Sequence, residues 1–317
     1  MGASRDGVGT GTQARRKGPV HPGSRAIQFD VWGSRGSRSL VPPQSRIGNY
    51  TSCYSVLDGR DLFALDAGRG LAALAHAVGT QARFRNVARL HVLVTHAHVD
   101  HWEGLKDADW FWLRRSRLAI TVFGPREALD AIRAGHAPPS YVPLGVLARG
   151  MNARLSYRAL RSGATRAIGR WTVRTEALNH FSGDGSWRRR LDTIGYRLAV
   201  PGGPTVAYIS DHEPSAGMAA AEARLVKGAD LAVYDAHFSE VREQTYGHGS
   251  HEHSARVART SPATLVLAGH HCPACSDDQI RGALRRHGRG LRNYRLAIEG
   301  RTYVWDPLKA GFRPLRP

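Results

Sequence analysis

A short segment in the first third of the chain gathers four side chains that can bind metal. Residues 95–104 read Thr-His-Ala-His-Val-Asp-His-Trp-Glu-Gly and follow an apolar run at residues 92–94. Imidazole nitrogens and carboxylate oxygens bind zinc and similar divalent ions, and a site that activates water keeps one coordination position open. His96 and His98, two apart at a strand end, can point the same way, while Asp100 and His101 can face a second ion. An HxH pair alone is weak among 16 histidines, but the complete HxHxDH after a strand is far more specific.

The second half of the chain supplies further metal-capable residues at the ends of expected strands. Alternating or continuous apolar runs predict strands over residues 171–177, 193–200, 205–209, 231–233 and 264–267, and helices near 219–226, 251–259 and 277–286. Three of these strands are followed by Asn179-His180, Ser210-Asp211-His212 and Gly269-His270-His271. An α/β scaffold places its reactive groups on loops at strand ends, so the recurrence carries more weight than any single residue.

The elements that must position the first segment lie mainly before it. We predict strands over residues 26–32, 50–57 and 62–65, a helix over 71–78, then a strand over 118–123 and a helix over 126–134. The loop at residues 33–37 can offer backbone N–H groups to a ligand or form a plain turn. Asp66, at a strand end before glycines, can orient a metal-binding histidine or cap the helix. Trp110, Phe111 and Trp112 are more typical of core packing than of base stacking.

Composition bounds the class of protein. The chain has 317 residues, 42% hydrophobic and 22% charged, with a formal net charge of +19. That charge favours phosphate-bearing partners, although scattered arginines also suit an ordinary solvated surface. Three cysteines are too few for a disulfide framework, and no apolar run approaches the roughly 18 residues of a membrane helix, so we expect a cytoplasmic protein without membrane contact. The composition of residues 1–25 predicts a disordered basic arm, which precedes one expected domain at residues 26–317.

These residues together resemble the metallo-β-lactamase superfamily over the chain from about Ile27 to the C-terminus. Within it, the similarity is to the branch that contains ribonuclease Z and bacterial cyclic-nucleotide phosphodiesterases. It is carried by the HxHxDH segment, by the strand-end residues His180, Asp211 and His270, and by four segments: residues 32–37 (Trp-Gly-Ser-Arg-Gly-Ser), 48–53 (Gly-Asn-Tyr-Thr-Ser-Cys), 65–68 (Leu-Asp-Ala-Gly) and 178–180 (Leu-Asn-His).

The resemblance implies an α/β fold, an αββα sandwich of two mixed sheets flanked by helices, with a dinuclear site at one edge. By position, one metal would take three histidines and the other an aspartate and two histidines, with one aspartate bridging. The implied ligands are His96, His98 and His180 for the first ion, Asp100, His101 and His270 for the second, and Asp211 as the bridge. The ions would be Zn²⁺ first, with Mn²⁺ or Fe also compatible with a His/Asp site.

The resemblance also implies one histidine close to the scissile phosphate. The matching stretch is Tyr-Gly-His-Gly-Ser at residues 246–250, which makes His248 the candidate to stabilise charge or protonate the leaving oxygen. His251 and His253, at a helix start, are predicted to be solvated or capping-region residues. The segment 181–192 carries Arg188-Arg189-Arg190, a phosphate clamp or a solvated loop. His212 is a weak candidate ligand, His271 is expected behind the ligands, and Cys272 and Cys275 are assigned no role.

The sequence therefore favours a dinuclear metal-dependent hydrolase, most simply a phosphodiesterase acting on a small or cyclic nucleotide, with Asp100 as proton acceptor. A ribonuclease Z-like RNA 3′-processing endonuclease is the alternative within the enzyme class, although no long Gly-Pro-rich insertion of the tRNA-clamping kind is present. A non-catalytic basic nucleic-acid-binding module is the alternative from another class, and it would bind in a salt-sensitive way. The sequence leaves a homodimer open.

Overall fold

The computed structural model describes residues 26–108, 118–150, 153–182, 189–214, 217–241, 247–262 and 264–315. The basic arm expected at residues 1–25, the aromatic cluster Trp110–Trp112 and Arg188 lie outside these ranges. Within them, no helix is both long and apolar enough to cross a bilayer.

The first sheet has eight strands in the order β17-β16-β1-β2-β3-β4-β5-β6. Its pairs from β17 to β3 are antiparallel and those from β3 to β6 are parallel. The strands are β1 (Gln28–Gly33), β2 (Cys53–Asp58), β3 (Asp61–Leu65), β4 (Arg89–Leu93), β5 (Leu118–Gly124), β6 (Ala153–Ala159), β16 (Thr302–Asp306) and β17 (Gly311–Pro314). The last two return from the far end of the chain, so its C-terminal residues complete the sheet that its first strand begins.

The second sheet has seven strands in the order β15-β14-β13-β12-β11-β8-β7. It is parallel from β12 to β15 and antiparallel from β12 to β7. The strands are β7 (Thr165–Ile168), β8 (Trp171–Ala177), β11 (Ile194–Ala199), β12 (Thr205–Ile209), β13 (Leu231–Asp235), β14 (Leu265–Gly269) and β15 (Tyr294–Leu296). A separate two-stranded ribbon joins β9 (Phe181–Ser182) to β10 (Arg189–Arg190).

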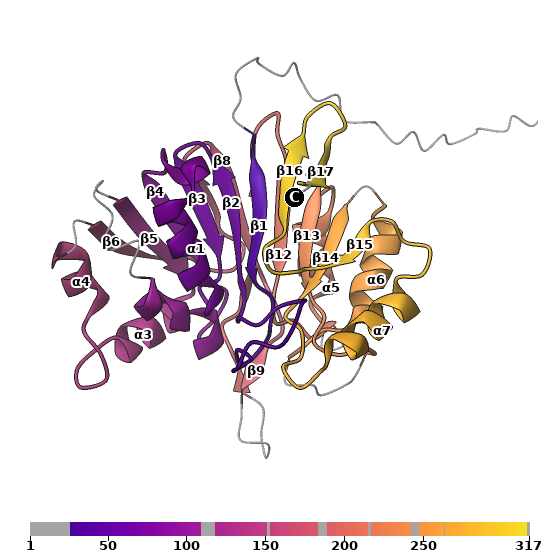
Figure 1. Cartoon of the computed structure of the whole chain (residues 1–317), viewed down its shortest axis with the longest axis horizontal. Helices are drawn as coiled ribbons and strands as arrows, with labels where there is room; N and C mark the ends of the chain where they lie inside the picture. Colours follow the sequence, from indigo (N-terminus) through magenta and orange to yellow (C-terminus); the bar gives the residue numbers. More distant parts are fainter. Residues whose placement is uncertain are drawn as a thin grey trace, which may run out of the picture.

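Helices cover the outer face of each sheet. Figure 1 shows the earlier helices at one side of the molecule and the later ones at the other. Three apolar clusters match these layers: one lies between the first sheet and its helices, one between the sheets and one under the later helices. The α-helices are α1 (Gly70–Thr80), α3 (Arg126–Gly135), α4 (Leu144–Gly150), α5 (Ala219–Val226), α6 (His251–Thr260) and α7 (Asp277–His287).

The predicted αββα sandwich of two mixed sheets is confirmed, and so are most of its expected elements. Alternation along β13 explains the layering, because Leu231 and Val233 face the inter-sheet core while Ala232 and Tyr234 face the helices. The segment after His98 forms two short 3₁₀ turns, η2 (Val99–His101) and η3 (Glu103–Asp107). Strands β6, β7, β15, β16 and β17 and helix α4 were not predicted.

A polar cluster lies where β3 and β4 begin, at the opposite end of these strands from the histidine segment. Asp61, at the start of β3, accepts hydrogen bonds from Arg89 Nε and Nη2 at 2.6 and 2.7 Å. Its Oδ1 also lies 2.9 Å from His91 Nε2. Burial acts to raise the pKa of Asp61, but the hydrogen bonds from Arg89 and His91 outweigh it and hold the pKa below its ordinary value. The carboxylate therefore stabilises the folded chain at neutral pH.

We expect Asp61→Asn to lower the free energy of unfolding by about 2 kcal/mol at pH 7, because the buried carboxylate loses its charge-assisted hydrogen bonds with the half-exposed Arg89 and with His91. Since the folded-state pKa is depressed, the wild-type advantage should be present above the ordinary aspartate pKa and shrink as the pH falls through acid values. Urea unfolding at pH 7 and in acid measures both effects. Asp130→Asn, at an exposed α3 position, is the matched control, and equal losses in the two variants would contradict the role given to Asp61.

Candidate metal centre

The candidate site lies where several strands end at one edge of the sandwich. Strands β3 and β4 run parallel in the first sheet, and β12, β13 and β14 run parallel in the second, so their carboxyl ends meet at common edges. The β8 strand runs in the same direction as β12, because each is antiparallel to β11. Loops from both sheets therefore supply the site. Its residues follow β4 (His96, His98), β8 (His180), β12 (Asp211) and β14 (His270).

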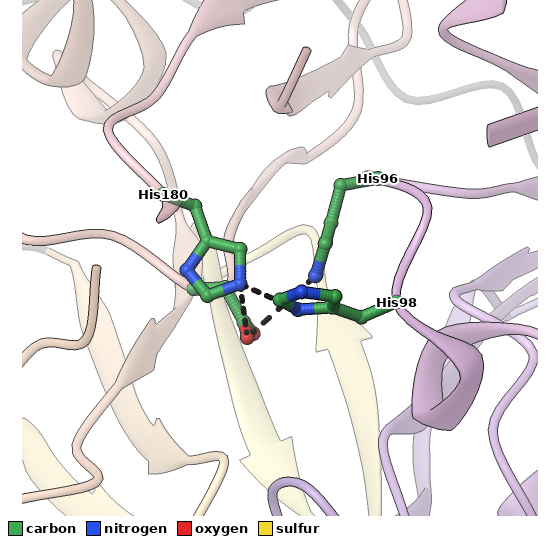
Figure 2. Close-up of side chains that lie close together, drawn as sticks. His96, His98 and His180 are labelled. Atoms are coloured by element: carbon green, nitrogen blue, oxygen red, sulfur yellow. Dashed lines mark hydrogen bonds and ion pairs between the residues drawn. The ribbon is translucent and has the colours of Figure 1, made fainter. Parts of the chain in front are cut away.

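The first cluster joins three imidazoles and one carboxylate. Figure 2 shows His96, His98 and His180 converging from two different loops. His98 Nδ1 lies 2.8 Å from His180 Nε2, and Asp211 Oδ2 lies 3.8 Å from His96 Nε2 and 3.5 Å from His180 Nε2. One ligand atom from each of the four residues lies within 4.8 Å of the others. This is the spacing of groups that face one ion.

The second cluster shares the same aspartate. Asp211 Oδ1 lies 3.3 Å from His101 Nε2 and 3.1 Å from His270 Nε2. Asp100 Oδ2 lies 3.3 Å from His101 Nε2 and 3.6 Å from His270 Nε2. The two oxygens of Asp211 thus face different clusters, one toward His96 and His180 and the other toward His101 and His270. All seven residues expected as ligands are brought together.

The donor atoms fit a divalent cation at each cluster. The Nε2 atoms of His96, His101 and His270 are buried and have no hydrogen-bond partner, which is costly unless something else binds them. Burial lowers the pKa of His96 and of His98, so both imidazoles are neutral and able to coordinate. The local field also favours positive charge: burial opposes protonation of His101, yet the carboxylates of Asp211, Asp100 and Asp66 raise its pKa well above the ordinary value.

Neighbouring groups fix the orientation of the candidate ligands. Asp66 Oδ2 lies 2.7 Å from His101 Nδ1 and accepts a hydrogen bond of 2.7 Å from the Tyr208 hydroxyl. Its Oδ1 accepts the Thr95 N–H at 2.8 Å. This confirms the expected contact of Asp66 with a histidine of the site and excludes the alternative of a helix cap. His180 Nδ1 lies 2.9 Å from the carbonyl oxygen of Gly247, which leaves Nε2 facing the cluster.

The glycine-serine loop at residues 33–37 packs against the site. The Ser37 N–H donates a hydrogen bond of 2.8 Å to Asp100 Oδ2, so the backbone of the loop binds a carboxylate of the protein itself. At Gly36 a Cβ would lie 2.5 Å from the His270 ring, which requires glycine there. The buried Arg35 guanidinium anchors the loop by donating from Nη1 to the carbonyl oxygens of Cys272 and Cys275 at 2.9 and 3.1 Å.

Two residues of the site were missed from the sequence. Asp235 ends β13, and its Oδ2 accepts the Gly249 N–H at 2.8 Å and lies 3.2 Å from His248 Nδ1. The His237 ring stacks on His248 with centroids 4.4 Å apart and lies 5.7 Å from His270. The signal was present, because Asp-Ala-His follows an apolar strand just as His180, Asp211 and His270 do. His248 itself lies beside the site, with Nδ1 3.7 Å from Asp211 Oδ2.

Other candidates have different surroundings. His212 lies with Nε2 3.5 Å from Glu222 and belongs to none of the clusters of candidate ligands that the described residues form. Of the two alternatives predicted for His251, solvation is wrong, because the side chain is buried with Nδ1 2.8 Å from the Tyr294 hydroxyl. The capping-region alternative agrees with its place as the first residue of α6, directly after the N-cap Ser250. His253 Nε2 lies 2.7 Å from Glu222.

The basic segment and the late cysteines have limited contacts. Arg189 forms an ion pair with Glu127, and Arg190 contacts the sulfur of Met218. His271 is buried and stacks on His251 with centroids 5.9 Å apart. Among the described residues, neither Cys272 nor Cys275 is in a disulfide, and neither belongs to a cluster of candidate ligands.

Comparison with known proteins identifies the fold family. The model of the β-lactamase superfamily domain matches residues 63–271. No curated protein sequence gives a significant match.

Similar solved structures share the fold at low sequence identity. Zn²⁺-bound PqqB from Methylobacterium extorquens is 16% identical, with a TM-score of 0.63 over 87% of this chain and 99% of its own. A diphosphatase of the PhnP family is 15% identical, with a TM-score of 0.61 over 87% and 96%. The short form of human tRNase Z is 15% identical, with a TM-score of 0.57 over 87% and 98%.

We expect Asp66→Asn to lower metal affinity about 10- to 100-fold while the chain stays folded, because His101 loses the carboxylate that orients it. Titration with a metal-competing chelator, followed by elemental analysis, measures the change. Asp107→Asn is the matched control, since the Asp107 carboxylate pairs with Arg69 at an exposed position. An unchanged affinity in the Asp66 variant would show that His101 needs no such orientation.

Proposed function

The chain belongs to the metallo-β-lactamase superfamily, whose members are mostly metal-dependent hydrolases, and we propose from this premise that it is a dinuclear metal-dependent phosphodiesterase. The substrate we propose is a small or cyclic nucleotide or a related phosphodiester. The observation that carries the proposal is the division of Asp211 between two clusters, with one carboxylate oxygen toward each. A closed four-ligand structural site would not need a shared carboxylate.

The residues assigned to the two ions are those expected from the sequence. His96, His98 and His180 would hold one ion, Asp100, His101 and His270 the other, and Asp211 would lie between them. Divalent ions there, with Zn²⁺ favoured and Mn²⁺ or Fe as alternatives, would supply Lewis acidity and lower the pKa of a coordinated water. The donor set of imidazoles and carboxylates is compatible with each of these metals.

Protein side chains would handle the protons. Asp100 is positioned to accept a proton from the attacking water, because the Ser37 N–H holds its Oδ2 toward His101 and His270. His248 is positioned to protonate the leaving oxygen. Burial opposes its charge, but the Asp235 carboxylate outweighs this effect and raises the pKa of His248 to about 9. At neutral pH the imidazolium carries a proton that can be donated.

The charge of the chain supports a phosphate-bearing substrate. The net charge of +19 raises the encounter rate with anions, and two of the fold neighbours are a diphosphatase and a tRNase Z. A ribonuclease Z-like RNA 3′-processing endonuclease remains the second candidate on the strength of that neighbour. The absence of a long Gly-Pro-rich insertion in the sequence favours the smaller substrate.

We expect His98→Ala and Asp211→Asn to lose bound metal and to hydrolyse bis(p-nitrophenyl) phosphate at least about 10³-fold more slowly than the wild type. Elemental analysis and the release of p-nitrophenolate measure the two effects. His76→Ala, an exposed histidine on α1, is the control and should keep both. Full hydrolysis by metal-free His98→Ala would end the proposal, and salt-sensitive nucleic-acid binding without turnover would favour the non-catalytic module.

The two enzymatic candidates separate in a direct comparison of substrates. We expect the metal-loaded protein to hydrolyse cyclic mononucleotides faster than it cleaves a precursor tRNA at its 3′ trailer. Chromatography of the nucleotide products and gel analysis of the RNA measure the two rates under the same conditions. Selective cleavage of the RNA would support the endonuclease instead.

We expect His248→Gln to lower kcat for phosphodiester hydrolysis about 100-fold while metal content stays at the wild-type level, because glutamine keeps a hydrogen-bond donor but cannot transfer a proton. Steady-state kinetics with elemental analysis tests this role. A leaving group of low pKa, such as p-nitrophenolate, should reduce the penalty relative to an alkyl alcohol. An equal penalty for both leaving groups would assign His248 to binding alone.

A further inference from the structure

A pocket next to the metal centre is bounded on its far side by α7. Its volume is about 360 Å³, at the lower end of the range for small-ligand sites. The segment after β13 forms one wall with His237, Phe238 and Ser239, and α7 forms the other with Ile280 and Ala283. We call this cavity the α7 pocket.

The α7 pocket shares a wall with the proposed catalytic site. The His237 ring that lines it stacks on His248 and lies 5.7 Å from the ring of His270. Cys272, two residues after His270, lines it as well. One side chain, that of His237, therefore separates this cavity from the His248 and His270 rings of the candidate metal centre.

The described residues that line the α7 pocket include no unpaired positive charge to hold a phosphate. Among the described residues that line it, the one arginine is Arg286, and its Nη1 donates 2.7 Å to Glu240 Oε1. Burial lowers the pKa of His251 to about 4, so this lining imidazole is neutral. A second phosphate would gain no free cation here, whereas an uncharged group would suit the walls.

The lining combines apolar surface with a few hydrogen-bonding groups. Phe238, Ile280 and Ala283 supply apolar contact, and an aromatic ring such as Phe238 is a surface on which a base can stack. The Gln279 carbonyl oxygen already accepts the Ser276 N–H in the cap of α7, which leaves its NH₂ group as a donor. The Nε2 atom of His251 is buried without a hydrogen-bond partner. These groups match the mixed polar edge and flat apolar faces of a heteroaromatic base.

We infer that the α7 pocket binds the uncharged nucleoside of a single-nucleotide phosphodiester, and this inference rests on the proposed function. The base would lie beside Phe238, and the phosphate of the substrate would lie at the metal centre. This assigns substrate selection to the segment 236–239 and to α7, away from the metal ligands. It also makes the preferred substrate a mononucleotide, because the cavity is enclosed on the α7 side.

Gly282→Phe is the variant that tests the pocket. Gly282 lines the cavity, and a Cβ added there would have only Arg285 Nη2 within 4 Å, at 3.9 Å, so a larger side chain can occupy the space without displacing the helix. Gly282→Ala is the matched control, and both substitutions favour helix formation over glycine. Phe238→Ala, which removes the stacking surface, is a second and independent variant.

Calorimetry on the metal-loaded protein compares adenosine monophosphate with methyl phosphate. We expect the wild type and Gly282→Ala to bind adenosine monophosphate about 10- to 100-fold more tightly than methyl phosphate. Gly282→Phe and Phe238→Ala should lose most of that preference while methyl phosphate binds with unchanged affinity. Hydrolysis of bis(p-nitrophenyl) phosphate by the wild type is measured in parallel.

The outcomes separate the two proposals. Hydrolysis without a preference for adenosine monophosphate, or a preference that survives in both variants, overturns the pocket assignment and leaves the phosphodiesterase in place. A preference that is lost in the two variants supports the assignment. An absence of hydrolysis by the metal-loaded wild type overturns the phosphodiesterase and the inference with it.

Discussion

The structure depends on how the protein tolerates several carboxylates in one buried region. Asp66, Asp100, Asp211 and Asp235 are each at most 7% exposed, and an isolated buried carboxylate is costly. Each one is therefore surrounded by donors: Asp66 by Thr95 and Tyr208, Asp100 by Ser37, Asp211 by Ser210 and Asp235 by Gly249. The remaining negative charge is directed at the imidazoles. The backbone N–H groups of Ser37, Thr95 and Gly249 are among these donors, so the loops that carry them must place these groups next to the carboxylate oxygens.

Hydrogen bonds around the buried carboxylates also join the two sheets. The Tyr196 hydroxyl donates a hydrogen bond of 2.6 Å to the carbonyl oxygen of Val94, and the Ile194 N–H donates one of 3.0 Å to the carbonyl oxygen of Thr95. The Tyr208 hydroxyl donates to the Asp66 carboxylate. These bonds lie where the His96 loop of the first sheet meets the His180 and Asp211 loops of the second. Because each candidate cluster takes residues from both sheets, the packing of the aromatic core between the sheets sets the distances within the site.

The sequence predicted the parts of the fold whose local pattern is strong. Buried strands such as β12 and a helix such as α5 carry clear apolar periodicity, and the HxHxDH segment is specific enough to place its neighbours. Strands β6 and β7 were missed because exposed arginines interrupt their pattern. Strand β16 is stabilised by pairing with the distant β1, and β17 by pairing with β16. Asp235 has the same local pattern as the predicted ligands, and only its contact with His248 in the folded chain shows that it belongs to the site. The α7 pocket could not be predicted, since it depends on how a helix packs against a loop.

Three of the strand-end residues, Asp66, Asp211 and His270, have left-handed backbones with φ of 56°, 46° and 51°. A side chain in this region costs on the order of 1 kcal/mol relative to glycine. Glycine at any of the three positions would relieve this strain, but it would also remove a side chain of the candidate site or its support. A search for stabilising mutations would therefore be drawn first to positions on which the proposed metal centre depends.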